Sequence, residues 1–278
     1  SEPPVYQDFT LILNLDGEIS EQAIKSGDMH INIGKQSIGE HWFTAQVRDK
    51  NNRLSHEIYE EFRVIDVGVY NQEIKNNTYI VTDEDLTNYQ IRKDDNEENA
   101  LLTKQGLQKL FDEKAASGVR KLILPKGIYQ IQSEFWFKSS VTNYNPDDYT
   151  DEEKETSLQG SKNPLSIPSN FILDLNGSTI KLKESLKWQN QSLLMEINNC
   201  YDSHVINGTF EGDYRRRDLS QLSNGAPRGE GGACFRIFNK SRYCSFENCT
   251  VKLFTGYCCT FGLNYGKTNF AKNFTCFH

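Results

Sequence analysis

The residue types that could carry chemistry in this chain gather in one short segment. Four carboxylates and four arginines stand between residues 211 and 230, namely Glu211, Asp213, Asp218, Glu230, Arg215, Arg216, Arg217 and Arg228. Enzymes that hydrolyse glycosidic bonds use two carboxyl groups, about 5 Å apart for retention of configuration and about 6.5–9.5 Å apart for inversion. The segment therefore offers candidate carboxylate pairs for this kind of chemistry.

Two roles are predicted within this segment. The candidate catalytic residues are Asp213, Glu230 and Glu211, and the candidate substrate-binding residues are Arg215, Arg217, Arg228 and Asp218. The arginines would bind acidic sugars, or one of them would act as the base of a lyase if its pKa were lowered. A structural alternative stays open. In it Glu211 and Asp213 cap a loop, and the other charges are simply solvated, as loop charges commonly are.

Other chemistries find less support in the residues. The seven cysteines lie between residues 200 and 276 without zinc-finger spacing, so we predict no metal site. Their odd number favours reduced, buried thiols in a chain folded in a cytosol, with a disulfide framework as the alternative. The glycine-rich stretch GEGGA does not lead from a strand into a helix, so no nucleotide cofactor is predicted. His204 could be a turn residue or a site residue, and no His stands in a recognisable Ser/His/Asp arrangement.

Charge and hydropathy exclude two classes of partner. The formal net charge is −7 and the one basic run is three residues long, which argues against binding to nucleic acid. No apolar run approaches the roughly 20 residues that a membrane-spanning helix needs. The N-terminal sequence SEPPVYQDF has neither the basic nor the apolar region of a signal peptide, so we expect it to be absent or removed.

Internal repeats indicate how the candidate segment is positioned. Asn207, Asn248 and Asn273 each begin an Asn-x-Thr-apolar sequence, and Asn176 begins a looser version, at spacings of 31, 41 and 25 residues. A second series, Asn198, Asn239 and Asn264, closes apolar strands at the same spacings of 41 and 25 residues. Two series in one phase predict stacked coils in which equivalent residues repeat every ~4.8 Å.

The coil length follows from the shorter spacing. A coil of 25 residues leaves about 16 extra residues in the 41-residue interval, and the polar, glycine-rich segment 212–232 is the predicted insertion. The asparagines match glycosylation acceptors, but their phase favours a ladder of amides that hydrogen-bond between coils. Cys234 and Cys259, which are separated by the same coil length, are predicted to stack in the core.

The rest of the chain divides into three parts. Residues 1–66 alternate apolar and polar side chains in short runs, including 9–15 and 29–33, which predicts an immunoglobulin-like β-sandwich. Residues 67–98 lose this period and are predicted to form a linker. Residues 99–117 have helical spacing, and Gly118 supplies the stop.

Two stretches of this chain resemble a known family. NALLTKQGLQKLFDEKAASGVRKLILPKGIYQIQ, followed by SNFILDLNGSTIKL, is similar to the N-terminal signature of pectate-lyase-like right-handed parallel β-helix proteins, phage tailspikes above all. The resemblance implies that helix 99–117 caps the β-helix and that Pro125, Gly127 and Tyr129 belong to its first coil. It extends over residues 99–278, so the expected fold class is all-β, with a sandwich followed by a β-helix. The acidic insertion 139–163 departs from the family pattern, and the chain stops in mid-repeat, so we expect distal coils to be missing.

Three functions fit these features. The first is a tailspike-like protein of a phage tail, expected as a homotrimer in the virion, that binds host surface glycan and degrades it, in contact with other virion tail proteins. The second is a secreted bacterial polysaccharide lyase or glycoside hydrolase. The third is a structural adaptor of a phage tail without an active site. None of them requires a cofactor, and the fold itself does not choose among them.

Overall fold

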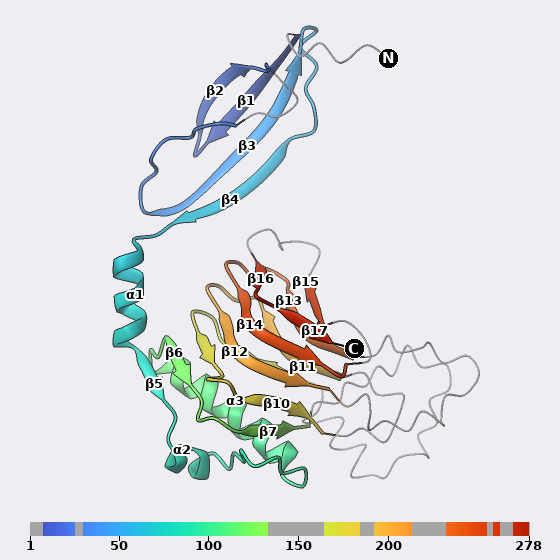
Figure 1. Ribbon diagram of the computed structural model, residues 1–278. Coiled ribbons are helices and arrows are strands. Elements are labelled where there is room, and N and C mark those ends of the chain that lie inside the picture. The colour runs from blue at the N-terminus through green and yellow to red at the C-terminus, as the bar shows by residue number, and fades with distance from the viewer. Residues whose placement is uncertain are drawn as a thin grey trace, which may run out of the picture. The chain divides into compact units, whose positions relative to one another are not determined.

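The computed structural model describes residues 8–25, 30–132, 164–183, 192–212, 232–254, 258–261 and 269–277 (Figure 1). The chain divides into two compact units, Ser1–Gln72 and Glu73–His278. The first contains an antiparallel sheet, and the second contains parallel strands and helices. The two units are described separately below.

One four-stranded sheet forms the described part of the first unit. Its strands are β1 (Phe9–Leu15), β2 (Glu18–Ala23), β3 (Gly39–Asp49) and β4 (Ile58–Val64), in the order β2-β1-β3-β4. The period-two pattern is realised, because Leu11, Leu13 and Leu15 pair with Val47, Ala45 and Phe43 on one face. The β1–β2 turn uses Asp16 and Gly17 at φ of 50° and 94°, as a two-residue hairpin turn requires.

The predicted sandwich differs from this arrangement. A sandwich needs two facing sheets, and the described residues of this unit form one sheet, so the immunoglobulin-like fold stays a prediction. Residues 30–38 are not part of a strand, although the alternation of Ile31 and Ile33 predicted one. Alternation specifies which side chains share a face, but it does not specify a partner strand.

The segment predicted as a linker, 67–98, is instead largely regular structure. It contains α1 (Val67–Asn76), β5 (Thr78–Ile80) and α2 (Asp83–Asn88). Thr82 caps α2, and the Asp85 side chain accepts a hydrogen bond from the Thr82 backbone, which completes a capping box. Val81, Leu86 and Ile91 are buried in the core of the second unit. A linker was predicted here because these elements are short and rich in Asn, Asp and Glu, which gives them no clear apolar period.

The amphipathic helix is α3 (Ala100–Ala116), within a residue of its predicted ends. Leu107, Leu110 and Phe111 are fully buried, and the Phe111 ring lies 6.1 Å from that of Phe171. Gly106 permits a close approach, since a Cβ there would lie 2.0 Å from the Tyr89 carbonyl oxygen. The helix therefore contributes one face to the core of the second unit.

Parallel strands make up the rest of this unit, and together with β5 we call them the parallel stack. They are β6 (Lys121–Ile123), β7 (Ile128–Ile131), β8 (Leu165–Ser166), β9 (Ile172–Asp174), β10 (Thr179–Leu182), β11 (Ser192–Asn198), β12 (His204–Glu211), β13 (Gly232–Phe238), β14 (Ser245–Lys252), β15 (Cys259–Phe261), β16 (Phe270–Lys272) and β17 (Thr275–Phe277). They pair as β5-β6-β9-β12-β14-β16, as β7-β10-β12-β14-β17 and as β8-β11-β13-β15 (Figure 1).

The strand register reproduces the first predicted spacing. Residues paired between β12 and β14 are 41 residues apart, as in His204 with Ser245. β14 pairs with β16 and β17 at 25 residues, which is also the separation of Asn248 and Asn273. In the other sheet β11 pairs with β13 at 40 residues, as in Glu196 with Arg236. The second asparagine series nevertheless keeps its predicted spacing of 41, because the Asn239 amide donates to Asn198 Oδ1 at 2.6 Å, while Asn264 lies outside the described residues. Cys259 is opposite Phe235, which corrects the predicted stacking of Cys259 on Cys234.

The predicted asparagine ladder is confirmed. The Asn273 amide donates to Asn248 Oδ1 at 2.9 Å, and the Asn248 amide donates to Asn207 Oδ1 at 3.2 Å. All three residues have φ in the left-handed region, at 49°, 53° and 61°, which asparagine tolerates better than most residues. We call these three residues the asparagine ladder. The amide nitrogens of Asn248 and Asn273 each donate a hydrogen bond to the equivalent asparagine of the neighbouring strand. This is the role that the sequence favoured over glycosylation.

The ladder ends on a carboxylate. Asn207 donates to Asp174 Oδ1 at 3.0 Å, and Lys121 Nζ lies 2.8 Å from Asp174 Oδ2. Burial by itself would raise the pKa of Asp174, but the hydrogen bonds from Lys121 and Asn207 outweigh it and hold that pKa below its ordinary value. Asn176 is not a member of the ladder, because its amide donates to the Leu124 carbonyl.

Aromatic and thiol side chains fill the interior between the sheets. Phe210, Phe235 and Phe246, from three different strands, are fully buried, and the Phe235 and Phe246 rings stack at 3.9 Å. Cys258 and Cys276 form a disulfide, which corrects the expectation of wholly reduced thiols. Their Cα atoms are 6.4 Å apart, a proximity that only the folded stack creates. The free thiols include Cys244 and Cys249, whose pKa values burial raises to about 12.

Candidate functional site

Of the predicted site residues, Glu211 is the one within the described part of the chain. Asp213, Glu230, Arg215, Arg217, Arg228 and Asp218 lie outside the described residues. Glu211 ends β12, and its Oε2 atom is 2.9 Å from Lys252 Nζ, its register partner on β14. This cross-strand ion pair differs from the loop cap that the structural alternative assigned to Glu211.

The predicted segment is bordered by the end of β12 and the start of β13, which belong to two different sheets of the parallel stack. β12 ends at Glu211 and β13 begins at Gly232, so residues 213–231 connect two sheets of the stack. The strands β7, β10, β12 and β14 are paired side by side, and so are the strands β8, β11, β13 and β15 that follow each of them. All four connections therefore join the same two sheets, and they begin at adjacent strand ends.

A polar column crosses the second of these sheets. Glu196 on β11 is in register with Ser166 on β8 and Arg236 on β13, and Arg236 is in register with Thr260 on β15. We call these four residues the Glu196 column. Adjacent strands place such residues about 4.8 Å apart. The column therefore offers a row of polar groups on the strands that the four connections lead into.

Glu196 and Arg236 are the charged centre of this column. Arg236 Nη2 is 3.0 Å from Glu196 Oε2, and the Ser166 hydroxyl donates to Glu196 Oε1 at 3.2 Å. The Glu196 side chain is 11% exposed and that of Arg236 is 35% exposed, so the pair is accessible from the Arg236 side. Arg236 also lies 3.9 Å from the centre of the Phe238 ring, a cation–π contact that restricts its orientation.

Not all of the N–H groups of Arg236 have a hydrogen-bond partner among the described residues. A guanidinium has five N–H donors, and the described contact to Glu196 uses the Nη2 group. Its Nε atom is buried and has no hydrogen-bond partner among the described residues. A planar guanidinium, a carboxylate and an aromatic ring together form a set of groups that suits a polyhydroxylated or acidic ligand.

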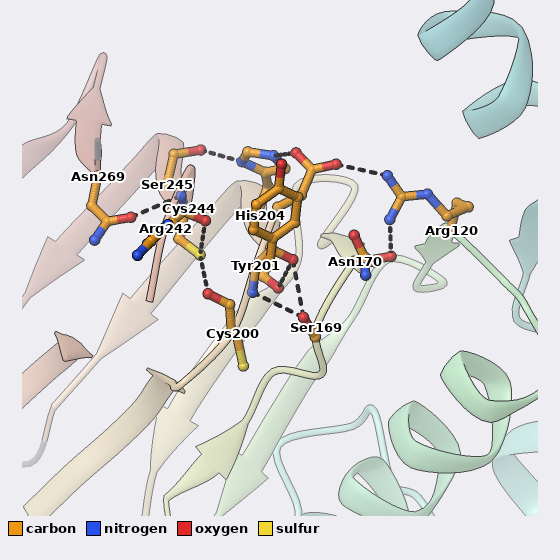
Figure 2. A network of polar contacts seen from close by, with 12 residues as sticks. Arg120, Ser169, Asn170, Cys200, Tyr201, His204, Arg242, Cys244, Ser245 and Asn269 are labelled. Carbon is orange, nitrogen blue, oxygen red and sulfur yellow. Dashed lines mark hydrogen bonds and ion pairs between the residues drawn. The ribbon is translucent and has the colours of Figure 1, made fainter. Parts of the chain in front are cut away.

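A second cluster, the Asp202 network, crosses the coils elsewhere (Figure 2). Asp202 is its centre, with a side chain only 2% exposed; Arg120 Nη2 lies 2.8 Å from its Oδ2 atom and His204 Nε2 lies 3.2 Å from its Oδ1 atom. His204 Nδ1 is 2.7 Å from Ser245 Oγ, and that hydroxyl donates to Glu247 Oε1 at 2.7 Å. Arg120 also contacts Glu73 through Nε at 3.0 Å. A chain of polar and charged side chains thus links α1 to β14.

The Asp202 network contains an Asp, a His and a Ser within hydrogen-bonding distance, which the sequence did not reveal. A nucleophilic serine must reach its substrate, and Ser245 is fully buried. Its proton is directed to Glu247, so His204 is its donor partner and not its base. The geometry favours a structural link between coils over acyl transfer. The accessible Glu196 column is therefore the better candidate for a functional site.

A signal for the Asp202 network, but not for the Glu196 column, was present in the sequence. His204 and Ser245 are 41 residues apart, the same spacing as Asn207 and Asn248, so the repeat alone would have placed them side by side. Glu196 and Arg236 are 40 residues apart, one fewer than the repeat, so the repeat does not place them side by side. Applied to every polar residue, the spacing of the asparagine ladder predicts the contact of His204 with Ser245, and with it this part of the Asp202 network.

Two further properties of the described residues bear on the kind of site. They contain no group of three or more His, Cys, Asp or Glu side chains arranged to hold a metal ion. None of the helices in the described part of the chain is long and apolar enough to cross a membrane.

Comparisons with known proteins add little to this geometry. No protein family model matches the chain, and no curated protein matches it. Among solved structures, a proposed glycosyl hydrolase from Parabacteroides merdae ATCC 43184 is similar over 72% of this chain and 93% of its own, with 11% sequence identity and a TM-score of 0.27. A TM-score at this level is too low to establish a shared fold, so the candidate site depends on the residues described above.

Proposed function

We propose that this chain binds polysaccharide along the Glu196 column and cleaves it there, with Glu196 as one of the two carboxyl groups. The observation that carries the proposal is the Glu196–Arg236 pair, accessible and aligned with Ser166 across three parallel strands. A row of groups repeating every ~4.8 Å suits a polymer with repeating units better than a compact ligand. Asp213 and Glu230, in the connection that leads into β13, remain the candidates for the second carboxyl group.

The proposed fold supports this interpretation. We propose that the parallel stack is the beginning of a right-handed parallel β-helix with α3 as its cap, and that the chain belongs with proteins of the tailspike type. The uniform register of β12 on β14, the asparagine ladder and the buried face of α3 support the proposal. The immunoglobulin-like sandwich, the homotrimer and the virion tail setting are proposals of the same kind, which sedimentation and electron microscopy would test.

The experiment uses the full chain and a panel of neutral and acidic polysaccharides. Binding is measured by calorimetry, and cleavage by the release of reducing ends, with ultraviolet absorbance to detect the double bond that a lyase leaves. Glu196→Gln preserves the shape of the side chain and removes its charge, so a catalytic carboxyl group predicts a loss of cleavage of at least about a hundredfold. Arg236→Ala should weaken binding at least about tenfold, as the loss of a charge-assisted hydrogen bond implies.

Glu247→Gln is the matched control, because Glu247 is also a partly buried carboxylate of the stack but belongs to the Asp202 network. It should bind and cleave as the wild type does. Cleavage that survives Glu196→Gln but is lost in Asp213→Ala or Glu230→Ala would move the catalytic site into residues 213–231. No binding across the panel would refute the proposal and favour the non-enzymatic adaptor.

The disulfide favours a second setting for the same activity. Cys258–Cys276 is typical of chains that fold in an oxidising compartment, so a secreted bacterial lyase or glycoside hydrolase is the alternative to a virion protein. Titration of thiols in denatured, non-reduced protein distinguishes the two. Seven free thiols per chain would favour assembly in a cytosol, and five would favour secretion.

A further inference from the structure

A buried histidine, His41 on β3, joins two segments of the first unit. Its side chain is only 8% exposed, and its two ring nitrogens face different partners. Nδ1 lies 2.5 Å from Asp16 Oδ2 in the β1–β2 turn, and Nε2 lies 2.8 Å from the Ser37 carbonyl oxygen. The ring stacks on Phe62 of β4 at 5.1 Å. His41 therefore connects the turn to the segment 30–38, which is not part of a strand.

Both contacts require a proton on the ring. A carbonyl oxygen can only accept a hydrogen bond, and an ionised carboxylate can only accept one as well. A neutral imidazole has a single N–H group, so it can satisfy Asp16 or Ser37 but not both. The imidazolium form satisfies both, and this conclusion depends on the positions of the acceptors alone.

The surroundings favour the charged form. Asp16 is held in place, because its Oδ1 atom accepts from the Trp42 backbone N–H at 2.9 Å. The charged groups that act on His41 are Asp16 and Glu40, both acidic. The hydrogen bond to Asp16 raises the pKa of His41 above its ordinary value, and the same hydrogen bond lowers the pKa of Asp16. Phe62, which covers the ring from β4, contributes no opposing charge.

We propose that His41 is a proton-dependent latch that holds the segment 30–38 against the β1–β2 turn and releases it as the pH rises. The sign follows from the linkage between folding and proton binding. The contribution of His41 is complete below its ordinary pKa of 6.5 and is lost as the pH rises through its raised folded pKa. The contribution of Asp16 is present above 3.8 and is lost as the pH falls through its lowered folded pKa.

Release would change the surface of the first unit. The segment carries Ile31 and Ile33, which are 38% and 36% exposed while the latch is closed. It also covers part of the ring edge of His41, through Ser37. Opening would free the Ser37 carbonyl for other contacts and would release the segment that carries these exposed apolar side chains, so the surface that this unit offers to a partner would depend on pH.

Nuclear magnetic resonance of the full chain, labelled with ¹⁵N, tests the latch. Below pH 6.5 both ring nitrogens of His41 should show the shifts of protonated imidazolium, and the change to the neutral form should occur above that pH. Amide exchange at residues 36–38 should then accelerate more than the tenfold per pH unit expected from base catalysis. Asp16→Asn should move the His41 transition to lower pH.

His41→Gln is the second variant, because glutamine keeps a donor for Ser37 but does not titrate in this range. Its exchange at residues 36–38 should follow base catalysis alone. A His41 transition below pH 6.5 in the wild type would overturn the proposal. An exchange profile that is identical in wild type and His41→Gln would also overturn it. Neither of these two results depends on whether Asp16→Asn folds.

Discussion

The asparagine ladder should carry a measurable part of the stability of the parallel stack, and Asn248 is the residue to test. It donates to Asn207 and accepts from Asn273, and its φ of 53° is in the left-handed region. Alanine at this position loses both hydrogen bonds, at about 0.5–1 kcal/mol each for exposed groups. It also adopts a left-handed conformation at a cost of about 1–2 kcal/mol. Asn248→Ala should therefore lower the free energy of unfolding by about 2–4 kcal/mol.

Glycine separates these two terms. Asn248→Gly loses the same hydrogen bonds but adopts a positive φ without strain, so it should cost about 1–2 kcal/mol. The matched control is Asn170, which also has a positive φ of 57° but whose side chain has no hydrogen bond among the described residues. Asn170→Ala should cost only the backbone strain, about 1–2 kcal/mol, and Asn170→Gly close to nothing.

Urea unfolding followed by far-ultraviolet circular dichroism measures these differences, with amide exchange of β14 to assign the transition to the stack. Equal stability of Asn248→Gly and wild type, within about 0.5 kcal/mol, would show that the inter-coil amides contribute nothing. Equal losses in Asn248→Ala and Asn170→Ala would lead to the same conclusion. Either result would refute the reasoning that the repeated asparagines are there to bond between coils.

Three further predictions concern the second unit. Burial lowers the pKa of Lys104 to about 8 from 10.5, so the unfolded chain binds the proton of this side chain more tightly than the folded chain does. The free energy of unfolding should therefore rise as the pH increases from about 8 to 10.5. In Lys104→Met the rise, of order 3 kcal/mol at about 1.4 kcal/mol per pKa unit, should be absent from urea titrations between pH 7 and 11. Arg120→Ala leaves the buried Asp202 carboxylate without its guanidinium and should cost about 3–5 kcal/mol in the same assay, part of which Arg120→Ala combined with Asp202→Asn should restore. Gly106→Ala places a methyl group 2.0 Å from the Tyr89 carbonyl oxygen and should lower the melting temperature far more than Gly118→Ala, whose added Cβ meets nothing within 4 Å but whose φ is +88°; similar melting temperatures would contradict the packing argument.

Repetition made part of this fold predictable. The spacings of 41 and 25 residues between asparagines are the register offsets of β12, β14, β16 and β17, because a side chain that bonds to its own equivalent must recur once per coil. Helix α3 was also predictable, since its apolar face follows from local sequence. The strand offsets in the other sheet, each one residue shorter, were not predictable, because Asn239, which bonds to Asn198 at the full 41 residues, follows the end of β13 and does not report the pairing within it.

The candidate site was harder to predict than the fold. Sequence reasoning selected charges that are close together along the chain, in residues 211–230, whereas Glu196 and Arg236 meet because their strands are paired. The Asp202 network was missed for the same reason, as Arg120 and Asp202 are 82 residues apart. Helix α2 was missed because it is short and its one buried side chain, Leu86, gives no helical pattern in the sequence.

The ladder has a direction as well as a spacing. Each amide N–H points to the preceding coil, from Asn273 to Asn248 to Asn207, and the last one points to the carboxylate of Asp174. Each step of the ladder joins one asparagine to the next and involves no residue between them. The length of chain between two asparagines can therefore vary, as intervals of 41 and 25 residues show, without disturbing the alignment. Evolution or an engineer could therefore exchange whole connections between strands while the asparagines keep the strands in register.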